Sequence, residues 1–258
     1  MAARDSALAG RVALVTGGGR GIGKAIASGV AADGADVAVN YRKDHDAAAE
    51  TVAEIERLGR RAVAYSASID DTAACEEMVG RTLADFGAVD ILVNNAGIAS
   101  RGQTVADTDP AEVERVWRTH AFASWLCSKL VLPSMRTRPR GDIVMISSAA
   151  TLYMGANSAP YNMAKAALEA LASTLAKEER RNGIHVNVVA PGLVDTEMGR
   201  RLVKGAMGVE DIRAMDGRSP FGHVCSPEEV ADVVRFVVSE RASYLTGQRI
   251  GVEGGAFQ

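Results

Sequence analysis

The sequence predicts a single doubly wound α/β domain, in which a parallel sheet carries helices on both faces. Two observations lead to this prediction. Segments that fit strands and segments with helical periodicity alternate along the whole chain without a break. The strand segments are almost continuously apolar, as expected for strands that are covered on both faces. No linker, internal repeat or shift in composition divides residues 1–258, so we expect one domain of Rossmann type.

The first strand is expected at 11–16, RVALVT, a short β-branched run that ends in a cluster of glycines. Apolar residues then recur at helical spacing from Ile22 to Val30, and Gly34 ends this helix. The remaining strands are expected at 35–41, 61–66, 89–93, 142–146, 184–190 and 248–252. The remaining helices are expected at 46–58, 72–86, 110–135, 158–182 and 227–239. The stretch 195–220 is rich in Gly, Met and Arg and is expected to be irregular.

The composition limits which binding partners and which cellular compartment we expect for this protein. The net charge of -3 gives no electrostatic reason to expect nucleic acid or a membrane surface as a partner. Cys75, Cys127 and Cys225 lie far apart and are odd in number, which favours a reducing compartment over a disulfide framework. The histidines show no metal-ligand spacing, and neither a signal peptide nor an apolar run of membrane-spanning length is found. The sequence therefore predicts a cytoplasmic protein without a metal site.

Polar and glycine motifs follow four of the expected strands. Asn94 and Asn95 follow the fourth strand, and Ser148 follows the fifth. Pro191 and Gly192 follow the sixth strand, and the glycine cluster follows the first. Ligands of open α/β sheets bind at the carboxyl ends of the strands, so these four motifs are expected to meet at one edge.

The glycine cluster, TGGGRGIG from Thr16 to Gly23, lies between the first strand and its helix. Glycines let the backbone approach a pyrophosphate, and the start of a helix offers free amide groups. The spacing Gly-x-x-x-Gly-x-Gly is one residue longer than the common dinucleotide fingerprint. We expect phosphate binding here, and the alternative is a simple tight turn.

The end of the second strand favours NADP(H) over NAD(H). An acidic residue at this point binds the ribose of NAD, whereas a nearby arginine accommodates the 2′-phosphate of NADP. The run VNYRK from Val39 contains no carboxylate before Asp44. Arg42 offers a planar fork to a phosphate, and Arg20 in the glycine cluster is expected to approach from the other side. The alternative is that both arginines are solvated surface charges and that NAD(H) binds.

Ser148, Tyr161 and Lys165 form the candidate catalytic group. Tyr161 and Lys165 are one helical turn apart and therefore lie on one face of the helix expected at 158–182. A phenol normally titrates near 10. A neighbouring ammonium lowers this pKa, and the Ser148 hydroxyl can hold the reacting oxygen. The alternative is that this tyrosine and lysine merely decorate the helix surface.

Together these motifs resemble the short-chain dehydrogenase/reductase family. The resemblance extends from about residue 8 to the C-terminus and includes PEEVA from Pro227 and YLTG from Tyr244. Within the family, the chain is most similar to the 3-oxoacyl-thioester (acyl carrier protein) reductases and to their relatives that act on other ketones and alcohols.

The resemblance implies a role for each catalytic side chain. Tyr161 would donate the proton in reduction and accept it in oxidation. Lys165 would lower the pKa of Tyr161 and bind the nicotinamide ribose. Ser148, which precedes the tyrosine by 13 positions as in the family, would orient the substrate oxygen.

The resemblance also implies a set of residues that contact the cofactor. Tyr41 occupies the position of the acidic residue of NAD-binding members. The Val194 backbone and the Thr196 hydroxyl would hold the carboxamide, and Asn95 to Gly97 would line the adenosine side. The full implied set is Gly17, Gly19, Arg20, Gly21, Ile22, Gly23, Tyr41, Arg42, Ser68, Ile69, Asn95, Ala96, Gly97, Tyr161, Lys165, Pro191, Gly192, Val194 and Thr196.

Two positions depart from the family pattern. Ser68, followed by Ile69, stands where an aspartate usually contacts the adenine, and its hydroxyl is expected to make a similar hydrogen bond. His120 stands where an asparagine usually serves as the fourth catalytic residue. We expect that proton relay survives with an altered pH profile, because imidazole titrates near neutral pH. The alternative is a buried histidine with no catalytic part.

The predicted reaction is the reversible, NADP(H)-dependent reduction of a ketone to a secondary alcohol, with an acyl thioester as one candidate substrate. One alternative is a dehydrogenase of a sugar, polyol, steroid or alicyclic alcohol, and another is a catalytically impaired dinucleotide-binding sensor or scaffold. The stretch 195–220 is expected to form a lid over the substrate, with a pair of helices packed on the core as the alternative. The resemblance also implies a homo-oligomer, commonly a tetramer.

Overall fold

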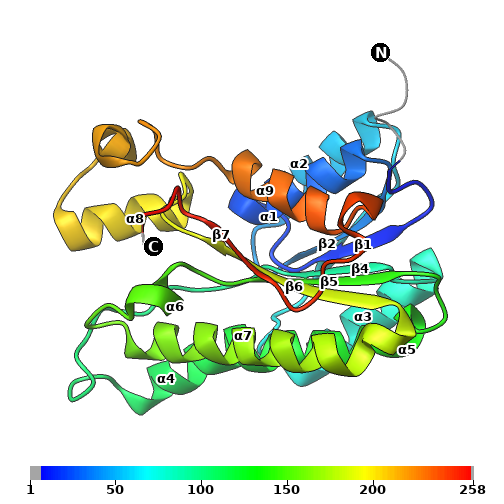
Figure 1. Ribbon diagram of the computed structural model, residues 1–258, viewed down its shortest axis with the longest axis horizontal. Helices are drawn as coiled ribbons and strands as arrows, with labels where there is room; N and C mark the ends of the chain where they lie inside the picture. Colours follow the sequence, from blue (N-terminus) through cyan, green and yellow to red (C-terminus); the bar gives the residue numbers. More distant parts are fainter. Residues whose placement is uncertain (1–6, 257–258) are drawn as a thin grey trace.

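The computed structural model describes residues 7–256 and shows a seven-stranded parallel sheet between two layers of helices (Figure 1). The strands lie in the order β3-β2-β1-β4-β5-β6-β7, and every neighbouring pair is parallel. Their bounds are β1 Val12–Val15, β2 Asp36–Tyr41, β3 Ala62–Ser66, β4 Ile91–Asn94, β5 Gly141–Ile146, β6 Ile184–Pro191 and β7 Arg249–Val252. The predicted doubly wound parallel sheet with helices on both faces is confirmed.

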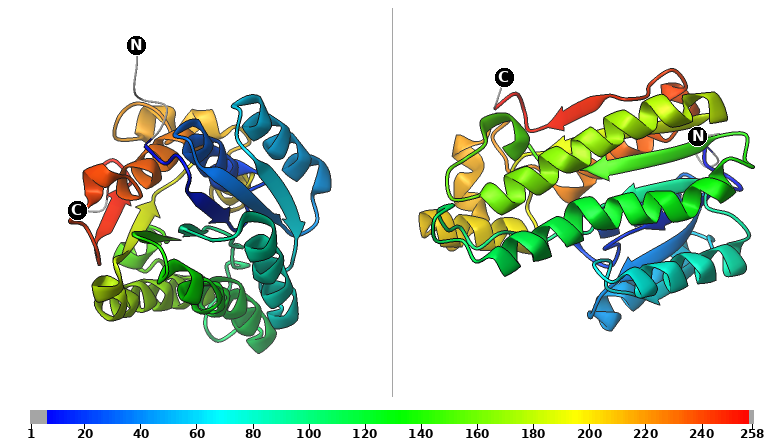
Figure 2. Two further views of the ribbon diagram at one scale, coloured as in Figure 1. Left: turned by 90° about the vertical axis from the view of Figure 1, so that its right-hand side faces the viewer. Right: turned by 90° about the horizontal axis from the view of Figure 1, so that it is seen from below.

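The two helical layers are seen on either side of the sheet in Figure 2. One layer contains α1 (Gly21–Ala32), α2 (His45–Arg57) and α9 (Pro227–Val237). The other contains α3 (Thr72–Phe86), α4 (Pro110–Trp117), α5 (Ala123–Met135) and α7 (Ala159–Glu179). Short 3-10 turns at Arg180–Asn182 and Glu240–Ala242 follow α7 and the last turn of α9, respectively. The long helices of the second layer run side by side beneath the sheet (Figure 2).

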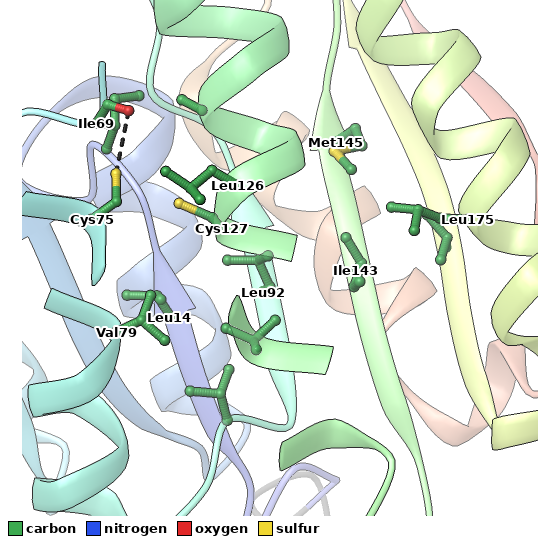
Figure 3. Close-up of a cluster of buried hydrophobic side chains, with 14 of the residues drawn as sticks. Leu14, Ile69, Cys75, Val79, Leu92, Leu126, Cys127, Ile143, Met145 and Leu175 are labelled. Atoms are coloured by element: carbon green, nitrogen blue, oxygen red, sulfur yellow. Dashed lines mark hydrogen bonds between the residues drawn. The ribbon is translucent and has the colours of Figure 1, made fainter. Parts of the chain in front are cut away.

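Alternating residues of each strand supply the two cores. Leu14 of β1 packs into the core beneath the sheet, whereas its neighbours Ala13 and Val15 pack into the core against α1 and α9. Figure 3 shows the first of these cores, where Leu92 and Ile143 of the sheet face the helices. Strands that are buried on both faces explain why their sequences are almost continuously apolar.

Most helices begin at a side chain that caps them. The carboxylates of Asp44, Asp71 and Asp109 accept backbone hydrogen bonds at the starts of α2, α3 and α4. Ser226 and Glu229 form a complete capping box on α9. Helix α1 differs, because its N-cap residue is Arg20, no side chain caps it and its first turn holds no acidic residue. The amide groups at the start of α1 therefore remain free for a ligand.

The structure corrects two predicted elements. The helix expected at 110–135 is interrupted by a π-helical turn, Arg118–Phe122, between α4 and α5. The stretch 195–220 is not irregular, since it forms α8 (Glu197–Met207) and a 3-10 helix, Ile212–Arg218. A small apolar cluster that includes Val203 and Ile212 packs these two helices together. Whether they form a lid over the substrate stays a prediction. A further short helix, α6 (Ala150–Tyr153), was not predicted.

Within residues 7–256, no helix is both long and apolar enough to cross a membrane. The same part of the chain contains no group of His, Cys, Asp and Glu side chains arranged to hold a metal ion.

Candidate active site

Ser148, Tyr161 and Lys165 meet at the carboxyl end of β5. Ser148 lies two residues beyond β5, and Tyr161 and Lys165 occupy successive turns at the start of α7. Lys165 is buried, and its Nζ atom donates to the carbonyl of Ile146 at 2.7 Å. The same Nζ atom lies 5.7 Å from the centre of the Tyr161 ring. The sequence prediction that these side chains share one site is therefore consistent with their placement.

The protein environment shifts the pKa values of this group. Tyr161 is partly exposed as a residue, but burial around its hydroxyl raises the pKa of Tyr161. A hydrogen bond with Ser148 opposes this rise. Burial lowers the pKa of Lys165 to about 7, and the charge of Glu169 opposes this shift. The expected lowering of the Tyr161 pKa by Lys165 is therefore wrong for the free protein, because burial outweighs the other effects.

His120 lies in the middle of the π-helical turn and packs against Tyr161. Its ring meets the Tyr161 ring edge-on, with the centres 5.4 Å apart and the planes at 85°. The Nε2 atom is 2.8 Å from the carbonyl oxygen of Ile98 and 3.1 Å from its amide nitrogen. Gly97 makes room for the imidazole, because a Cβ atom there would lie 2.5 Å from its Cε1. The buried Nδ1 atom has no hydrogen-bond partner among the described residues.

The environment of His120 favours a neutral ring. Burial, and then the charge of Lys165, lowers the pKa of His120 to about 3. The imidazole therefore stays neutral at pH 7. This supports the alternative of a packed histidine over the expected relay by a ring that titrates near neutral pH.

The glycine cluster folds into a tight cradle between β1 and α1. Gly17 and Gly21 adopt positive φ angles of 63° and 53°, which favour glycine. A Cβ atom on Gly23 would lie 2.1 Å from the carbonyl oxygen of Gly17 and 2.5 Å from Nδ2 of Asn95. Only glycine fits at this position, so the loop stays close to the start of α1. Together with the uncapped amides of α1, this cradle fits a dinucleotide pyrophosphate.

Thr16 ties the cradle to the end of β4. Its Oγ1 atom accepts the amide groups of Asn95 at 2.9 Å and Ala96 at 3.0 Å. The Asn95 amide side chain in turn donates to the carbonyl of Thr16 at 2.8 Å. From the other side, Oδ1 of the buried Asn40 accepts the amide of Gly17 at 3.1 Å. Neither Thr16 nor Asn40 was predicted to contribute to the site, although a polar residue within the apolar run 35–41 was a usable signal.

The segment that follows β6 lies beside the same cradle. The amide of Gly192 donates to Val252 at 3.0 Å, and Val194 forms a β-bridge with Cys225. Thr196 caps α8, and its Cγ2 atom lies 3.3 Å from the position of a Cβ atom on Gly21. The structure therefore brings the motifs that follow β1, β4, β5 and β6 to one edge of the sheet, where α6 and α8 lie at the left in Figure 1.

Three comparisons place this chain among known proteins. The family model described as enoyl-(acyl carrier protein) reductase matches residues 17–256. The 3-oxoacyl-[acyl-carrier-protein] reductase of Synechocystis sp. is 37% identical over 251 residues, which cover 97% of this chain and 98% of that protein. A crystal structure of a short-chain dehydrogenase from Burkholderia cenocepacia in complex with NADP superposes with a TM-score of 0.88 at 38% identity, covering 97% of this chain and 99% of that one.

The chain belongs to the short-chain dehydrogenase/reductase family. The resemblance noted in the sequence is thus confirmed, and the protein is an NAD(P)-dependent oxidoreductase. This short-chain dehydrogenase/reductase is also 34% identical to the L-rhamnose 1-dehydrogenase (NAD(P)(+)) of Sphingomonas sp. strain SKA58, over 97% of both chains.

The arginines predicted to bind a 2′-phosphate lie in different surroundings in this short-chain dehydrogenase/reductase. Arg20 pairs with Glu197 at the start of α8, with an N–O distance of 2.7 Å. Arg42 is exposed just beyond the end of β2. Its neighbour Tyr41 shares a hydrogen bond with Nδ1 of His45 at 3.0 Å. Both arginines remain candidates for the phosphate, and Arg20 would first have to leave Glu197.

Ser68 lies in the loop after β3, as the predicted adenine contact requires. Its hydroxyl donates to Oδ1 of Asp70 at 2.5 Å, which leaves the Ser68 oxygen able to accept from an adenine amine. The carbonyl of the adjacent Ile69 accepts a hydrogen bond from Sγ of Cys75 at 3.3 Å, a contact drawn in Figure 3. The adenine contacts of Ser68 and Ile69 remain predictions.

Proposed function

We propose that this protein is an NADP(H)-dependent oxidoreductase that interconverts a ketone and a secondary alcohol, with Tyr161 as the acid and base. The observation that carries the proposal is the convergence of Ser148, Tyr161 and Lys165 beside the glycine cradle. A binding module without catalysis has no need of a buried lysine one turn away from a tyrosine that faces a serine hydroxyl.

Each side chain has a distinct task in this proposal. The nicotinamide cofactor, when bound, supplies or accepts the hydride. Tyr161 donates a proton to the carbonyl oxygen in reduction and accepts it from the alcohol in oxidation. Ser148 holds the same oxygen by a hydrogen bond. Lys165 holds the nicotinamide ribose and, as an ammonium, stabilises the phenolate that forms when Tyr161 loses its proton.

The backbone and polar groups of the sheet edge would hold the rest of the cofactor. The amides at the start of α1 would bind the pyrophosphate, and Val194 and Thr196 would hold the carboxamide. The preference for NADP(H) is supported by Arg20 and Arg42 and by the absence of a carboxylate at Tyr41, and NAD(H) is the alternative. The superposed enzyme from Burkholderia cenocepacia contains NADP, which is consistent with this preference.

Exposed apolar side chains on the segments that lie at the carboxyl edge of the sheet support a substrate with an apolar part. Tyr153 and Met154 after β5, and Met198 and Leu202 on α8, are large apolar side chains that are 43% to 58% exposed. We propose that α8 and the 3-10 helix after it form a lid whose apolar face covers a ketone or acyl thioester. Oxidation of a sugar is the second candidate, because the chain is 34% identical to an L-rhamnose 1-dehydrogenase.

We also propose a homotetramer in the cytoplasm. An apolar hollow between α4 and α7, lined by residues such as Val113, Trp117 and Met163, lies on the outer side of the second helical layer. Burial of this hollow against another copy would remove the exposed Trp117 and Met163 from water. Free Cys75, Cys127 and Cys225 support a reducing compartment.

The test is the oxidation of NADPH and NADH by the purified protein with an acetoacetyl thioester, a panel of plain ketones and, in the oxidative direction, L-rhamnose. We expect turnover of a ketone with NADPH preferred, and loss of this preference in Arg42→Leu. Turnover with NADH alone would contradict the proposed roles of both arginines. Tight binding of NADPH without turnover of any substrate would contradict the proposed function.

A further inference from the structure

Ile146, Ser147 and Ser148 each form a hydrogen bond with a charged side chain. Lys165 donates to the carbonyl of Ile146 at 2.7 Å. The hydroxyl of Ser147 donates to Oε1 of Glu169 at 2.6 Å. Arg249 donates from Nη2 to the carbonyl of Ser148 at 3.3 Å. The chain from Ile146 to Ser148 is thus fastened at every residue.

Glu169 and Arg249 also contact each other and share a third partner. Nε of Arg249 lies 3.2 Å from Oε1 of Glu169, which joins the last strand, β7, to α7. The hydroxyl of Thr151 lies 2.8 Å from Oε1 of Glu169 and 3.1 Å from Nη2 of Arg249. The side chains of Glu169 and Arg249 are only 22% and 25% exposed, so solvent screens this pair less than a surface ion pair.

The position of Glu169 on α7 relates it to the catalytic lysine. Lys165 and Glu169 are four residues apart, so they lie on one face of the helix. The buried ammonium is destabilised by desolvation, and the carboxylate of Glu169 opposes this effect. From other elements, the neutral His120 faces Lys165. The positively charged Arg249 faces Glu169.

We propose that Glu169 and Arg249 are positioning residues for the oxidoreduction: they hold the Ser148 turn against α7, and the carboxylate of Glu169, paired with Arg249, sets the electrostatic environment of Lys165. This inference rests on the proposed function and adds two residues to it. Neither residue touches the reacting atoms. They act through the position of Ser148 and through the charge on Lys165.

The two members of the pair carry opposite charges, so we expect their removal to have opposite effects on Lys165. Glu169→Gln removes the carboxylate and leaves the positive charge of Arg249, so the pKa of Lys165 should fall. Arg249→Gln leaves the carboxylate without its partner, so the same pKa should rise. Ketone reduction requires a protonated Tyr161 and a charged Lys165. The alkaline limb of its pH–rate profile should therefore move to lower pH in Glu169→Gln and, by a smaller amount, to higher pH in Arg249→Gln.

The experiment measures kcat and KM for ketone reduction with NADPH between pH 6 and 10 in the wild type and both variants. We expect kcat to fall about tenfold in each, because the Ser148 turn loosens. The KM for NADPH should change by less than about twofold, since the cradle is untouched. The alkaline limb should move by about half a pH unit in Glu169→Gln.

Two further variants serve as controls. Glu178→Gln, an exposed position of the same helix, should change nothing. Thr151→Val should lower kcat without moving the limb, because it removes the hydrogen bonds of the hydroxyl to Ser148, Glu169 and Arg249 but no charge.

The outcomes separate this inference from the proposed function. Limbs that do not move, or that move in the same direction in Glu169→Gln and Arg249→Gln, would overturn the inference while ketone reduction by the wild type upholds the function. A wild type that binds NADPH but reduces no ketone would overturn both. Thermal melting of each variant checks its folding, and Thr151→Val provides a milder test of the turn if a charge variant does not fold.

Discussion

Buried charges are paired differently at the two edges of the central sheet, that is, at the amino ends and at the carboxyl ends of its strands. At the amino ends of the strands, Asp142 accepts hydrogen bonds from Arg11 at 2.6 Å and from Arg140 at two positions, both 2.9 Å. Asp90 similarly accepts the Arg138 side chain at 2.6 Å and the backbone amide of Val12 at 2.8 Å. Both carboxylates are almost inaccessible to solvent, and each is held by more than one donor. This edge fastens the strands together.

At the carboxyl ends, buried polar groups are left with unused capacity. Nδ1 of His120 and Oδ1 of Asn162 have no hydrogen-bond partner within residues 7–256. Lys165 is a buried cation whose nearest acceptor is a neutral carbonyl, and α1 begins without a side-chain cap. The same sheet therefore pairs its buried carboxylates at one edge for stability and leaves Lys165, His120 and the start of α1 available at the other for a ligand and a reaction. Substitutions at the two edges should accordingly have different consequences.

The largest effect is expected for Tyr161→Phe at the catalytic edge. Removal of the hydroxyl should lower kcat about a thousandfold, because the proton donor is lost, while NADPH binding is kept. Tyr244→Phe, on a fully exposed tyrosine, is the matched control and should leave kcat unchanged. A Tyr161→Phe variant that retains more than about a tenth of the activity would assign the proton transfer to another group.

At the opposite edge, Asp142→Asn should change stability and not activity. The substitution leaves the partly buried guanidinium groups of Arg11 and Arg140 without the Asp142 carboxylate, at a cost of about 3 kcal/mol in the free energy of unfolding. Urea denaturation measures this loss, and kcat of the folded protein should stay within about twofold of the wild type. Asp232→Asn, an exposed partner of Arg235, should cost less than about 0.5 kcal/mol. A large loss of kcat in folded Asp142→Asn would remove the distinction between the two edges.

Lys165 should make the stability of the free protein depend on pH. Its pKa is about 7 in the folded chain and near 10.5 without the fold, so between these values the unfolded chain binds more protons. Stability contributed by this group should therefore rise with pH from 7 to 10, by up to about 1.4 kcal/mol per pH unit, and be flat below pH 7. Lys165→Met should abolish this rise, which is read as the difference between the unfolding free energies of wild type and variant. A difference that does not change with pH would mean that Lys165 titrates normally in the folded protein.

The smallest effect is expected for His120→Asn. A pKa of about 3 places the titration of His120 below the working pH range. The limbs of the pH–rate profile between pH 5 and 9 should then coincide in wild type and variant. A limb that disappears or shifts in the variant would restore the titrating relay considered for this residue.

The sequence was sufficient for features that depend on local pattern, and insufficient for those that depend on packing. Apolar runs located the strands, and the spacing of Tyr161 and Lys165 placed both on one helix face. The π-helical turn at Arg118–Phe122 could not be predicted, because it is a local change of hydrogen-bond register within a helical sequence. The contact between Glu169 and Arg249 joins residues 80 positions apart, so only the folded sheet brings them together. The expected lowering of the Tyr161 pKa failed for a related reason, since burial was not visible in the sequence.

The most direct test of the account is a single turnover with NADPH that carries deuterium at both C4 positions of the nicotinamide. The wild type should transfer one deuterium to the carbonyl carbon of a ketone, which mass spectrometry detects in the product alcohol, and Tyr161→Phe should bind the same cofactor with little transfer. Absence of deuterium in the product of the wild type, with cofactor bound, would contradict the claim that the carboxyl edge of the sheet is a site of hydride transfer.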